Sequence, residues 1–103
     1  MFGNLMDKMQ EAQQQMQEVK DKLSSIFVEA EAEGGLVKVK ADGNRKIRDI
    51  TISELLVKQG DTEAIEELVL TAINRVLDKA EQIAENEIQG AAKDLLPNIP
   101  GLF

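Results

Sequence analysis

The sequence predicts a small α+β protein with a long helix at each end and a three-stranded antiparallel sheet between them. Three observations carry this prediction. Apolar residues recur at steps of three and four over residues 2–26, alternate residues are apolar over 28–41, and helical spacing returns after residue 61. A chain of 103 residues corresponds to one domain, which we assign to 1–94, followed by an apolar tail with Pro and Gly at 95–103.

The N-terminal segment carries a heptad seam that is typical of a coiled coil. The residues between the seam positions are polar and rich in Gln, so only a narrow stripe of this helix can be buried. We interpret the Met residues of the seam as core filling rather than as ligands. The seam consists of Phe2, Leu5, Met9, Ala12, Met16, Val19, Leu23 and Ile26.

The alternating segment predicts a β-hairpin over residues 28–41. A Gly-Gly pair interrupts the alternation and is suited to a tight turn between two strands. A two-residue turn at this pair sets Glu31 opposite Lys38 and Glu29 opposite Lys40, and apolar residues then face apolar residues. A slip of one residue would set Glu opposite Val, so charge and apolarity predict the same register.

A second turn is predicted at Asp42-Gly43-Asn44, where Gly or Asn can adopt a positive φ. A three-residue loop there sets Lys40 opposite Lys46 and Lys38 opposite Arg48. The isoleucines beyond the turn cannot share one face under strict alternation, and we therefore expect a β-bulge at Arg48 and the residue that follows it.

The cations of this sheet allow two interpretations. Glu29 and Glu31 can neutralise the middle strand, which favours a cross-strand ladder of ion pairs. In the predicted register, however, Lys46 and Arg48 have no acidic residue directly opposite, and Arg45 lies in the loop beside them. That arrangement favours a surface that binds an anionic partner. The sequence leaves both interpretations open.

The segment after the third strand predicts a short helical turn that Gly60 closes, and then a long helix. Asp61 or Thr62 is suited to the N-cap, and the helix extends to about Lys93. We expect its first half to lie across the sheet and its second half to project. The two long helices should measure roughly 37 and 45 Å, more than a three-stranded sheet can cover. They therefore either pair within one chain or pack against a second copy, and we expect a homodimer.

Composition argues against most enzyme classes. The chain has 12 Lys and Arg residues against 19 Asp and Glu residues, a net charge of −7, and no His or Cys. It thus lacks the usual general base and the commonest metal ligands, and it has no glycine-rich phosphate motif. We expect neither catalysis nor a cofactor, a metal or a small-molecule substrate. No stretch is long and apolar enough to cross a bilayer, so we expect a cytoplasmic protein without a membrane partner.

The order and spacing of these elements resemble the YbaB/EbfC family of bacterial nucleoid-associated proteins. The resemblance lies in Gly35-x-Val37-x-Val39-x-x-x-Gly43, then Ile47, Ile50 and Ile52, then Asp61-x-Glu63-x-Ile65-Glu-Glu-Leu68 with Ala72 and Ala80, and the ending Pro100-Gly101-Leu102. It implies a tweezer-shaped homodimer that binds double-stranded DNA with little sequence preference. It also implies a location at the nucleoid and a role in nucleoid organisation or gene expression.

The resemblance does not assign contact residues, so the candidates come from charge alone. Lys and Arg suffice for contacts to phosphates, whereas base stacking is not expected because Trp and Tyr are absent. The candidates for nucleic-acid binding are Lys38, Lys40, Arg45, Lys46 and Arg48 on the sheet, and Arg75 and Lys79 on the last helix.

A protein-binding scaffold is the alternative. Long helices that project from hairpins are also the plan of prefoldin-like chaperone subunits, whose helix tips hold partner proteins. Apolar residues at the ends of the helices, around Phe2, Leu5 and Met6 and around Leu95-Leu96, fit this plan. A dimeric adaptor that binds another DNA-processing protein and does not touch DNA belongs to the same class of alternative.

Overall fold

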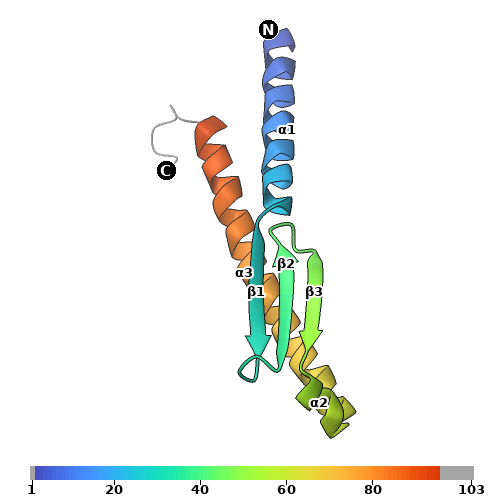
Figure 1. Ribbon diagram of the computed structural model, residues 1–103. Helices are drawn as coiled ribbons and strands as arrows, with labels where there is room; N and C mark the ends of the chain where they lie inside the picture. The colour runs from blue at the N-terminus through green and yellow to red at the C-terminus, as the bar shows by residue number, and fades with distance from the viewer. Residues whose placement is uncertain (1, 96–103) are drawn as a thin grey trace.

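A computed structural model describes residues 2–95 and shows an elongated molecule in which two long helices project from a small sheet (Figure 1). The molecule measures 68 × 25 × 18 Å, and its radius of gyration of 19.6 Å exceeds the value of about 13 Å expected for a compact chain of this length. The elements are α1 (Phe2–Ser24), β1 (Phe27–Ala32), β2 (Val37–Asp42), β3 (Ile47–Ile52), α2 (Glu54–Gln59) and α3 (Thr62–Leu95).

This order confirms the predicted fold class. The last helix includes Leu95, the first residue of the predicted tail, and residues 96–103 lie outside the described part of the chain. The predicted caps are also present. Gly60 ends α2 in a left-handed conformation with φ 70°, and the Asp61 carboxylate accepts a hydrogen bond of 3.1 Å from the Ala64 N–H at the start of α3.

The three strands form an antiparallel sheet in the order β1-β2-β3. The predicted register of the first pair is confirmed, because Glu29 lies opposite Lys40 and Glu31 opposite Lys38. The turn between them closes with a 3.3 Å hydrogen bond from the Leu36 N–H to the carbonyl of Glu33. Both glycines within this turn have positive φ, which explains why Gly is required there.

The predicted register of the second pair is wrong. Lys40 lies opposite Asp49 rather than Lys46, and Lys38 lies opposite Thr51 rather than Arg48. The strand β2 continues through Asp42, so the turn begins later than expected. The expected bulge does occur at Arg48, which is the extra residue between the pairs of β3 with Ala41 and Lys40.

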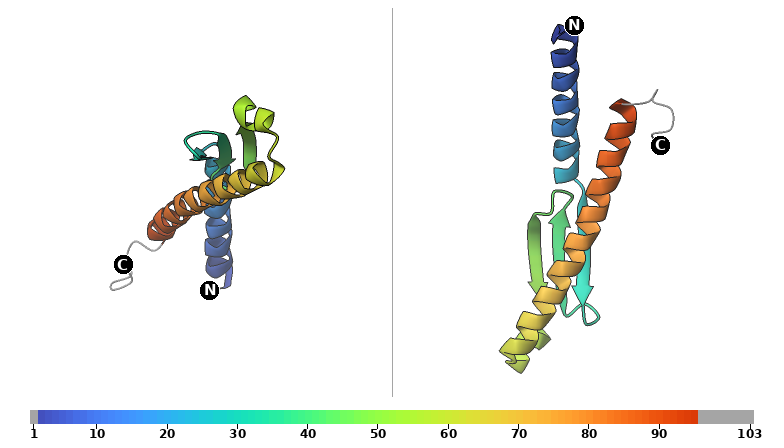
Figure 2. Two further views of the ribbon diagram at one scale, coloured as in Figure 1. Left: turned by 90° about the horizontal axis from the view of Figure 1, so that it is seen from below. Right: turned by 180° about the vertical axis from the view of Figure 1, so that it is seen from behind.

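One face of the sheet packs against α3, and the hydrophobic core lies between them. Alternate side chains of β1 and β2 are buried there together with one face of α3, while α2 adds a single buried leucine. Seen from behind in Figure 2 (right), α3 crosses in front of β1 and β2 and leaves β3 to one side. As predicted, the second half of α3 projects beyond the sheet. The core residues are Ala30, Ala32, Val37, Val39, Ala41, Leu56, Ala72 and Val76.

The two long helices meet only near the base of α1 and do not form a hairpin along their length (Figure 1). Near the sheet, Leu23 of α1 is buried, and Lys22 forms an ion pair of 2.9 Å with Glu87 of α3. Toward the N-terminus, Leu5 and Met9 of the heptad seam are more than half exposed. The seam is therefore covered at one end and open at the other.

Candidate nucleic-acid interface

The face of the sheet that α3 does not cover carries nearly balanced charges. Lys38 and Lys40 of the middle strand are flanked on one side by Glu31 and Glu29, and on the other side Lys40 faces Asp49. The Lys40 ammonium also lies 4.7 Å from the centre of the Phe27 ring, within the range of a cation–π contact. The predicted pairs of like charges between β2 and β3 are absent, and the observed register instead sets the lysines of β2 beside acidic residues of both neighbouring strands.

Arg48 is engaged in a structural ion pair with Asp42. Its Nε donates to Asp42 Oδ2 at 2.9 Å, and its Nη2 lies 2.7 Å from the same oxygen. The other carboxylate oxygen accepts the backbone N–H groups of Asn44 at 2.8 Å and Lys46 at 3.1 Å. Burial of Asp42 raises its pKa, but these hydrogen bonds outweigh burial and hold the pKa below its ordinary value. The Arg48 side chain therefore stabilises the turn through its ion pair with Asp42.

Arg75 and Lys79 cover the free edge of β1. The Arg75 guanidinium donates to the carbonyl oxygen of Glu31 at 2.9 Å, and the Lys79 ammonium donates to that of Glu29 at 2.7 Å. Such carbonyls of an edge strand would otherwise be available for pairing with another chain. These two predicted DNA-contact residues therefore have a structural role that the sequence did not indicate.

The turn between β2 and β3 docks against the C-terminal end of α1, and Gly43 makes this contact possible. Its N–H lies 2.9 Å from the carbonyl oxygens of both Leu23 and Ile26. A Cβ at position 43 would lie 2.8 Å from Leu23 Cδ2 and 2.9 Å from the Leu23 oxygen. The predicted reason for Gly at this position was wrong, since the residue of the turn with positive φ is Arg45 (66°). The glycine permits close approach instead.

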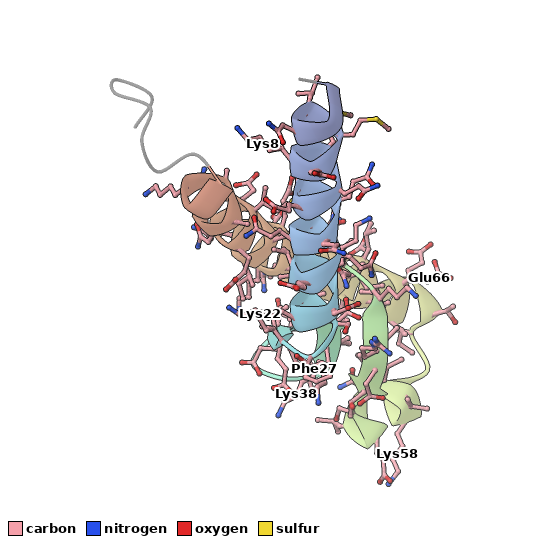
Figure 3. The ribbon with its side chains drawn as sticks, turned by 90° about the horizontal axis from the view of Figure 1, so that it is seen from above. Lys8, Lys22, Phe27, Lys38, Lys58 and Glu66 are labelled. Carbon is pink, nitrogen blue, oxygen red and sulfur yellow. The ribbon has the colours of Figure 1, made fainter. Side chains whose placement is uncertain are left out.

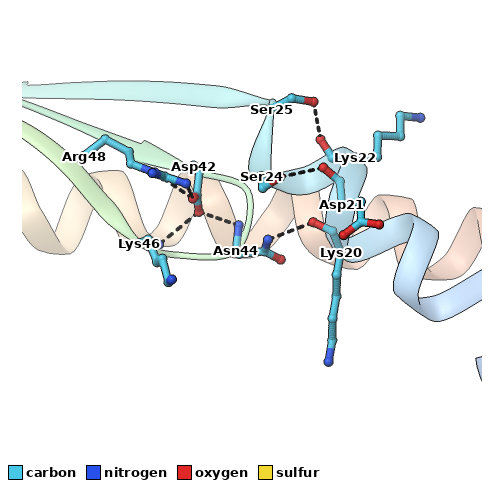
Figure 4. A network of polar contacts seen from close by, with 9 residues as sticks. All are labelled: Lys20, Asp21, Lys22, Ser24, Ser25, Asp42, Asn44, Lys46 and Arg48. Atoms are coloured by element: carbon cyan, nitrogen blue, oxygen red, sulfur yellow. Dashed lines mark hydrogen bonds and ion pairs between the residues drawn. The ribbon is translucent and has the colours of Figure 1, made fainter.

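Consecutive carbonyl groups near the end of α1 accept hydrogen bonds from this turn and from two serines, as Figure 4 shows. The Asn44 side chain donates to the carbonyl of Lys20 at 2.9 Å, and the backbone N–H of the preceding residue, Gly43, donates to the carbonyl of Leu23. Ser24 and Ser25 donate to the carbonyls of residues 21 and 22 at 2.6 and 2.8 Å. A helix end normally leaves such carbonyls without partners. Here they are paired, which anchors the base of α1 to the sheet.

The docked turn brings together three exposed cations, Lys20, Arg45 and Lys46, which we call the basic junction. In Figure 4 the side chain of Lys20, on α1, and that of Lys46, on the turn, extend in the same direction. Two of these residues were predicted from the sequence, and Lys20 was not. No local pattern links position 20 with the turn, because only the contact between Asn44 and the helix brings them together.

Within residues 2–95, no group of three or more acidic residues is arranged to hold a metal ion. Over the same part of the chain, no helix combines the length and the apolar character needed to span a membrane.

The model of the YbaB/EbfC DNA-binding family matches residues 1–95. The chain belongs to this family. The predicted resemblance is thereby confirmed over nearly the whole sequence. The match includes both long helices and the sheet between them, so the base of α1 and the basic junction lie within the part that is shared with the family.

Curated relatives agree with this assignment, and one solved structure shares the fold. The chain is 38% identical to a nucleoid-associated protein of Chlorobaculum parvum over 92% of its own length and 84% of the relative. It is 40% identical to a nucleoid-associated protein of Chloroflexus aurantiacus over 96% and 95% of the two lengths. The crystal structure of the uncharacterized protein HP0035 from Helicobacter pylori matches with a TM-score of 0.74 at 21% identity, covering 88% of this chain and 92% of that one. That likeness concerns the fold.

Proposed function

We propose that this protein binds double-stranded DNA as a homodimer, with little sequence preference, and contributes to nucleoid organisation. Membership of a DNA-binding family and relatives with the name nucleoid-associated protein support the choice of ligand. The observation that carries the proposal on this chain is the basic junction, where Lys20, Arg45 and Lys46 are exposed and form no ion pair with any of residues 2–95.

The overall charge makes a localised site necessary. A net charge of −7 repels a polyanion at long range, so attraction must come from a region where cations outnumber acids. The balanced face of the sheet does not meet this condition, since Glu29, Glu31 and Asp49 flank its lysines. The basic junction does. Side-chain contacts of this kind reach phosphates and carry no sequence information, which agrees with low specificity.

The uncovered side of the sheet supports the homodimer. Ile47 and Ile50 of β3 point to the same face as the core, but they remain 37% and 43% exposed because α3 crosses only the other strands. A second copy would bury this apolar surface and the free edge of β3 together.

In such a dimer, each chain contributes one basic junction and one pair of projecting helices. Two junctions related by a twofold axis can contact separate phosphates of one duplex, which raises the affinity of a site that is weak in the monomer. The dimer is thus part of the binding mechanism.

The test is fluorescence anisotropy of the full chain with a labelled DNA duplex, titrated at several salt concentrations, with light scattering to give the mass of the protein. We expect the logarithm of the affinity to fall linearly with the logarithm of the salt concentration. Lys46→Glu should reduce the slope by about two, because about 0.9 is lost for each phosphate contact and a dimer loses two contacts. Lys20→Glu should act in the same direction.

Lys58→Glu is the matched control. Lys58 is exposed on α2, at the end of the sheet away from the basic junction, and its reversal changes the net charge by the same amount (Figures 1 and 3). Equal losses for Lys46→Glu and Lys58→Glu would assign the effect to net charge and overturn the junction. A wild-type protein that does not bind DNA even at low salt would overturn direct DNA binding altogether.

A protein-binding scaffold is the second candidate function, and one observation favours it. Leu5, Met6 and Met9, near the tip of α1, are each more than half exposed, whereas Leu23 at the base of the same helix is buried. This surface is separate from the basic junction, so the two functions can coexist in one protein.

A further inference from the structure

The exposed half of the α1 seam is an unpartnered helix face with a defined charge pattern. Writing Phe2 as position a of a heptad places Leu5, Met9, Ala12 and Met16 at successive d and a positions. The first two are more than half exposed, and the other two are partly exposed because α3 approaches only the lower part of the helix. A stripe that keeps this spacing fits one further helix.

The charges of α1 are sorted around this stripe. Its lysines occupy the positions that flank the seam, Lys8 and Lys22 at g and Lys20 at e. Its acidic residues occupy the outward positions c and f, which are Glu11, Glu18, Asp7 and Asp21. Figure 3 shows Lys8 and Lys22 on the same side of the helix. Residues at e and g select the partner of a coiled coil, so a helix that pairs with this seam should carry acidic flanks.

The chain itself contains one example of this complementarity. Where the lower part of α1 meets α3, Lys22 at a g position pairs with Glu87 at 2.9 Å. In a parallel pair of α1 helices, Lys8 at g would lie opposite Gln13 at e, and Lys20 at e would lie opposite Gln15 at g, so no ion pair would form at the flanks. The charge pattern therefore favours a partner helix with acidic flanks over a second copy of α1.

The side of the seam away from α3 is also open. A hollow of about 400 Å³ runs along α1 there, lined by Ala12, Gln13, Met16, Gln17 and Lys20. Its floor is apolar, its rim carries amides, and its lower end carries a cation. Met side chains adapt to apolar partners of different shape, which suits a surface that receives a helix from another protein.

We propose that the exposed seam of α1 is a docking site for an acidic amphipathic helix of a partner protein. The partner would place apolar residues against Leu5, Met9 and Met16, and carboxylates against Lys8 and Lys20. Because Lys20 also belongs to the basic junction, an acidic helix bound here would compete with DNA for that lysine. The proposal rests on α1 and does not depend on whether the junction binds DNA.

Two synthetic peptides of about three heptads test this proposal on the full chain. Both carry Leu at the a and d positions. One has Glu at every e and g position and the other has Lys there, so that like charges prevent each peptide from pairing with itself. Fluorescence anisotropy of the labelled peptides is measured against the wild-type protein. We expect saturable binding of the Glu peptide, at least tenfold tighter than binding of the Lys peptide, and weaker binding at higher salt.

Variants of α1 test whether peptide binding depends on the seam or is nonspecific. Leu5→Gln with Met9→Gln should weaken binding of the Glu peptide at least tenfold, and Lys8→Glu should reduce the preference for it. Gln14→Glu, on the opposite face of α1, is the control and should lower the affinity by less than twofold. Equal binding of both peptides, no binding of either, or unchanged binding by the seam variant would overturn the proposal.

Two further results would reassign the surface. If the seam variant lowers the mass of the free protein in light scattering, a second copy occupies the seam and the partner helix is wrong. If the variant weakens binding of a DNA duplex as strongly as Lys46→Glu does and leaves the peptide unaffected, the seam belongs to the DNA site. The circular dichroism spectrum of each variant confirms that α1 remains folded.

Discussion

The two edges of the sheet are treated in opposite ways. Along β1, α3 lies over the strand, and Arg75 and Lys79 donate to two of its carbonyl groups. Along β3, no helix covers the strand, five of its six residues are exposed, and two isoleucines on its core face remain accessible. One edge is closed by the chain itself and the other is available to a second molecule.

The difference teaches how a chain of this size can direct its own association. Edge strands pair readily with other chains unless they are protected, and a protein with two open edges would polymerise. Closing β1 leaves β3 as one site, which allows a closed dimer with a twofold axis and disfavours an open chain of subunits. The same α3 that closes one edge leaves the other exposed, because it crosses the sheet on a diagonal (Figure 2).

The largest effect is expected at Asp42, which joins the open strand to its neighbour. Asp42→Ala removes the acceptor of two backbone N–H groups and of Arg48, and should lower the free energy of unfolding by about 3 kcal/mol. Chemical denaturation followed by circular dichroism measures this loss. A loss below about 1 kcal/mol would mean that β3 is held mainly by its ladder with β2.

The same carboxylate predicts a pH dependence. Because its pKa is lower in the folded chain than the ordinary 3.8, its contribution is complete above that value and is lost as the pH falls through the folded pKa. We expect the difference in unfolding free energy between the wild type and Asp42→Asn to be constant near neutral pH and to narrow below about pH 3.8. A difference that widens on acidification would contradict this assignment.

The next effect tests the open edge directly. Ile50→Glu should leave the monomer folded, because Ile50 is 43% exposed, and should weaken dimerisation at least hundredfold, or about 2.7 kcal/mol. Light scattering over a dilution series measures the concentration at which the dimer dissociates. Thr51→Glu is the control, since the adjacent side chain points to the opposite face. Equal dissociation of both variants would mean that the core-side surface of β3 is not the contact.

Gly43→Ala should cost about 2 kcal/mol, because the new methyl group would clash with Leu23 unless α1 or the turn moves. The turn connects β3, on the open side of the sheet, to α1. We therefore expect both β3 and the base of α1 to unfold at a lower temperature in this variant. Gly3→Ala is a suitable control, because nothing lies near a Cβ at that position. Hydrogen exchange of the amides at the base of α1 would locate the effect, and no change there would exclude the clash as its cause.

The smallest effect is expected at the closed edge. Arg75→Ala and Lys79→Ala should each lower the free energy of unfolding by about 1 kcal/mol, the usual value for one hydrogen bond. The double variant should also form larger assemblies on concentration, because the β1 edge then becomes available. Asn74→Ala, exposed on the same helix, should do neither. A double variant that keeps the mass of the wild type would mean that the packing of α3 alone closes this edge.

The sequence predicted the parts of this fold that depend on neighbouring residues. Alternating charge specified the β1-β2 register, since Glu31 opposite Lys38 and the apolar pairs agree. It did not specify the β2-β3 register, because Asp42 resembles a turn residue and is in fact the last residue of the strand. Its carboxylate holds Arg48 in the bulge, a contact that no periodicity encodes.

The candidate site was harder to predict for the same reason. Charge alone identified Arg75 and Lys79, yet their direction depends on how α3 crosses the sheet, and they contact the β1 backbone. Lys20 was missed because its place in the basic junction arises from the hydrogen bond between Asn44 and α1. Long-range contacts of single side chains decide which cations are available, and these are not visible in a local pattern.

The anchored base of α1 gives the helix the mechanics of a lever. Its four paired carbonyl groups and Gly43 fix one end within the sheet, while a rod of about 35 Å extends from this pivot. A rotation of about 10° at the pivot moves the tip by about 6 Å, half the width of a DNA major groove. Small repacking around Leu23 is therefore amplified at the far end of the helix, and the stiffness of one short turn sets how far that end can move.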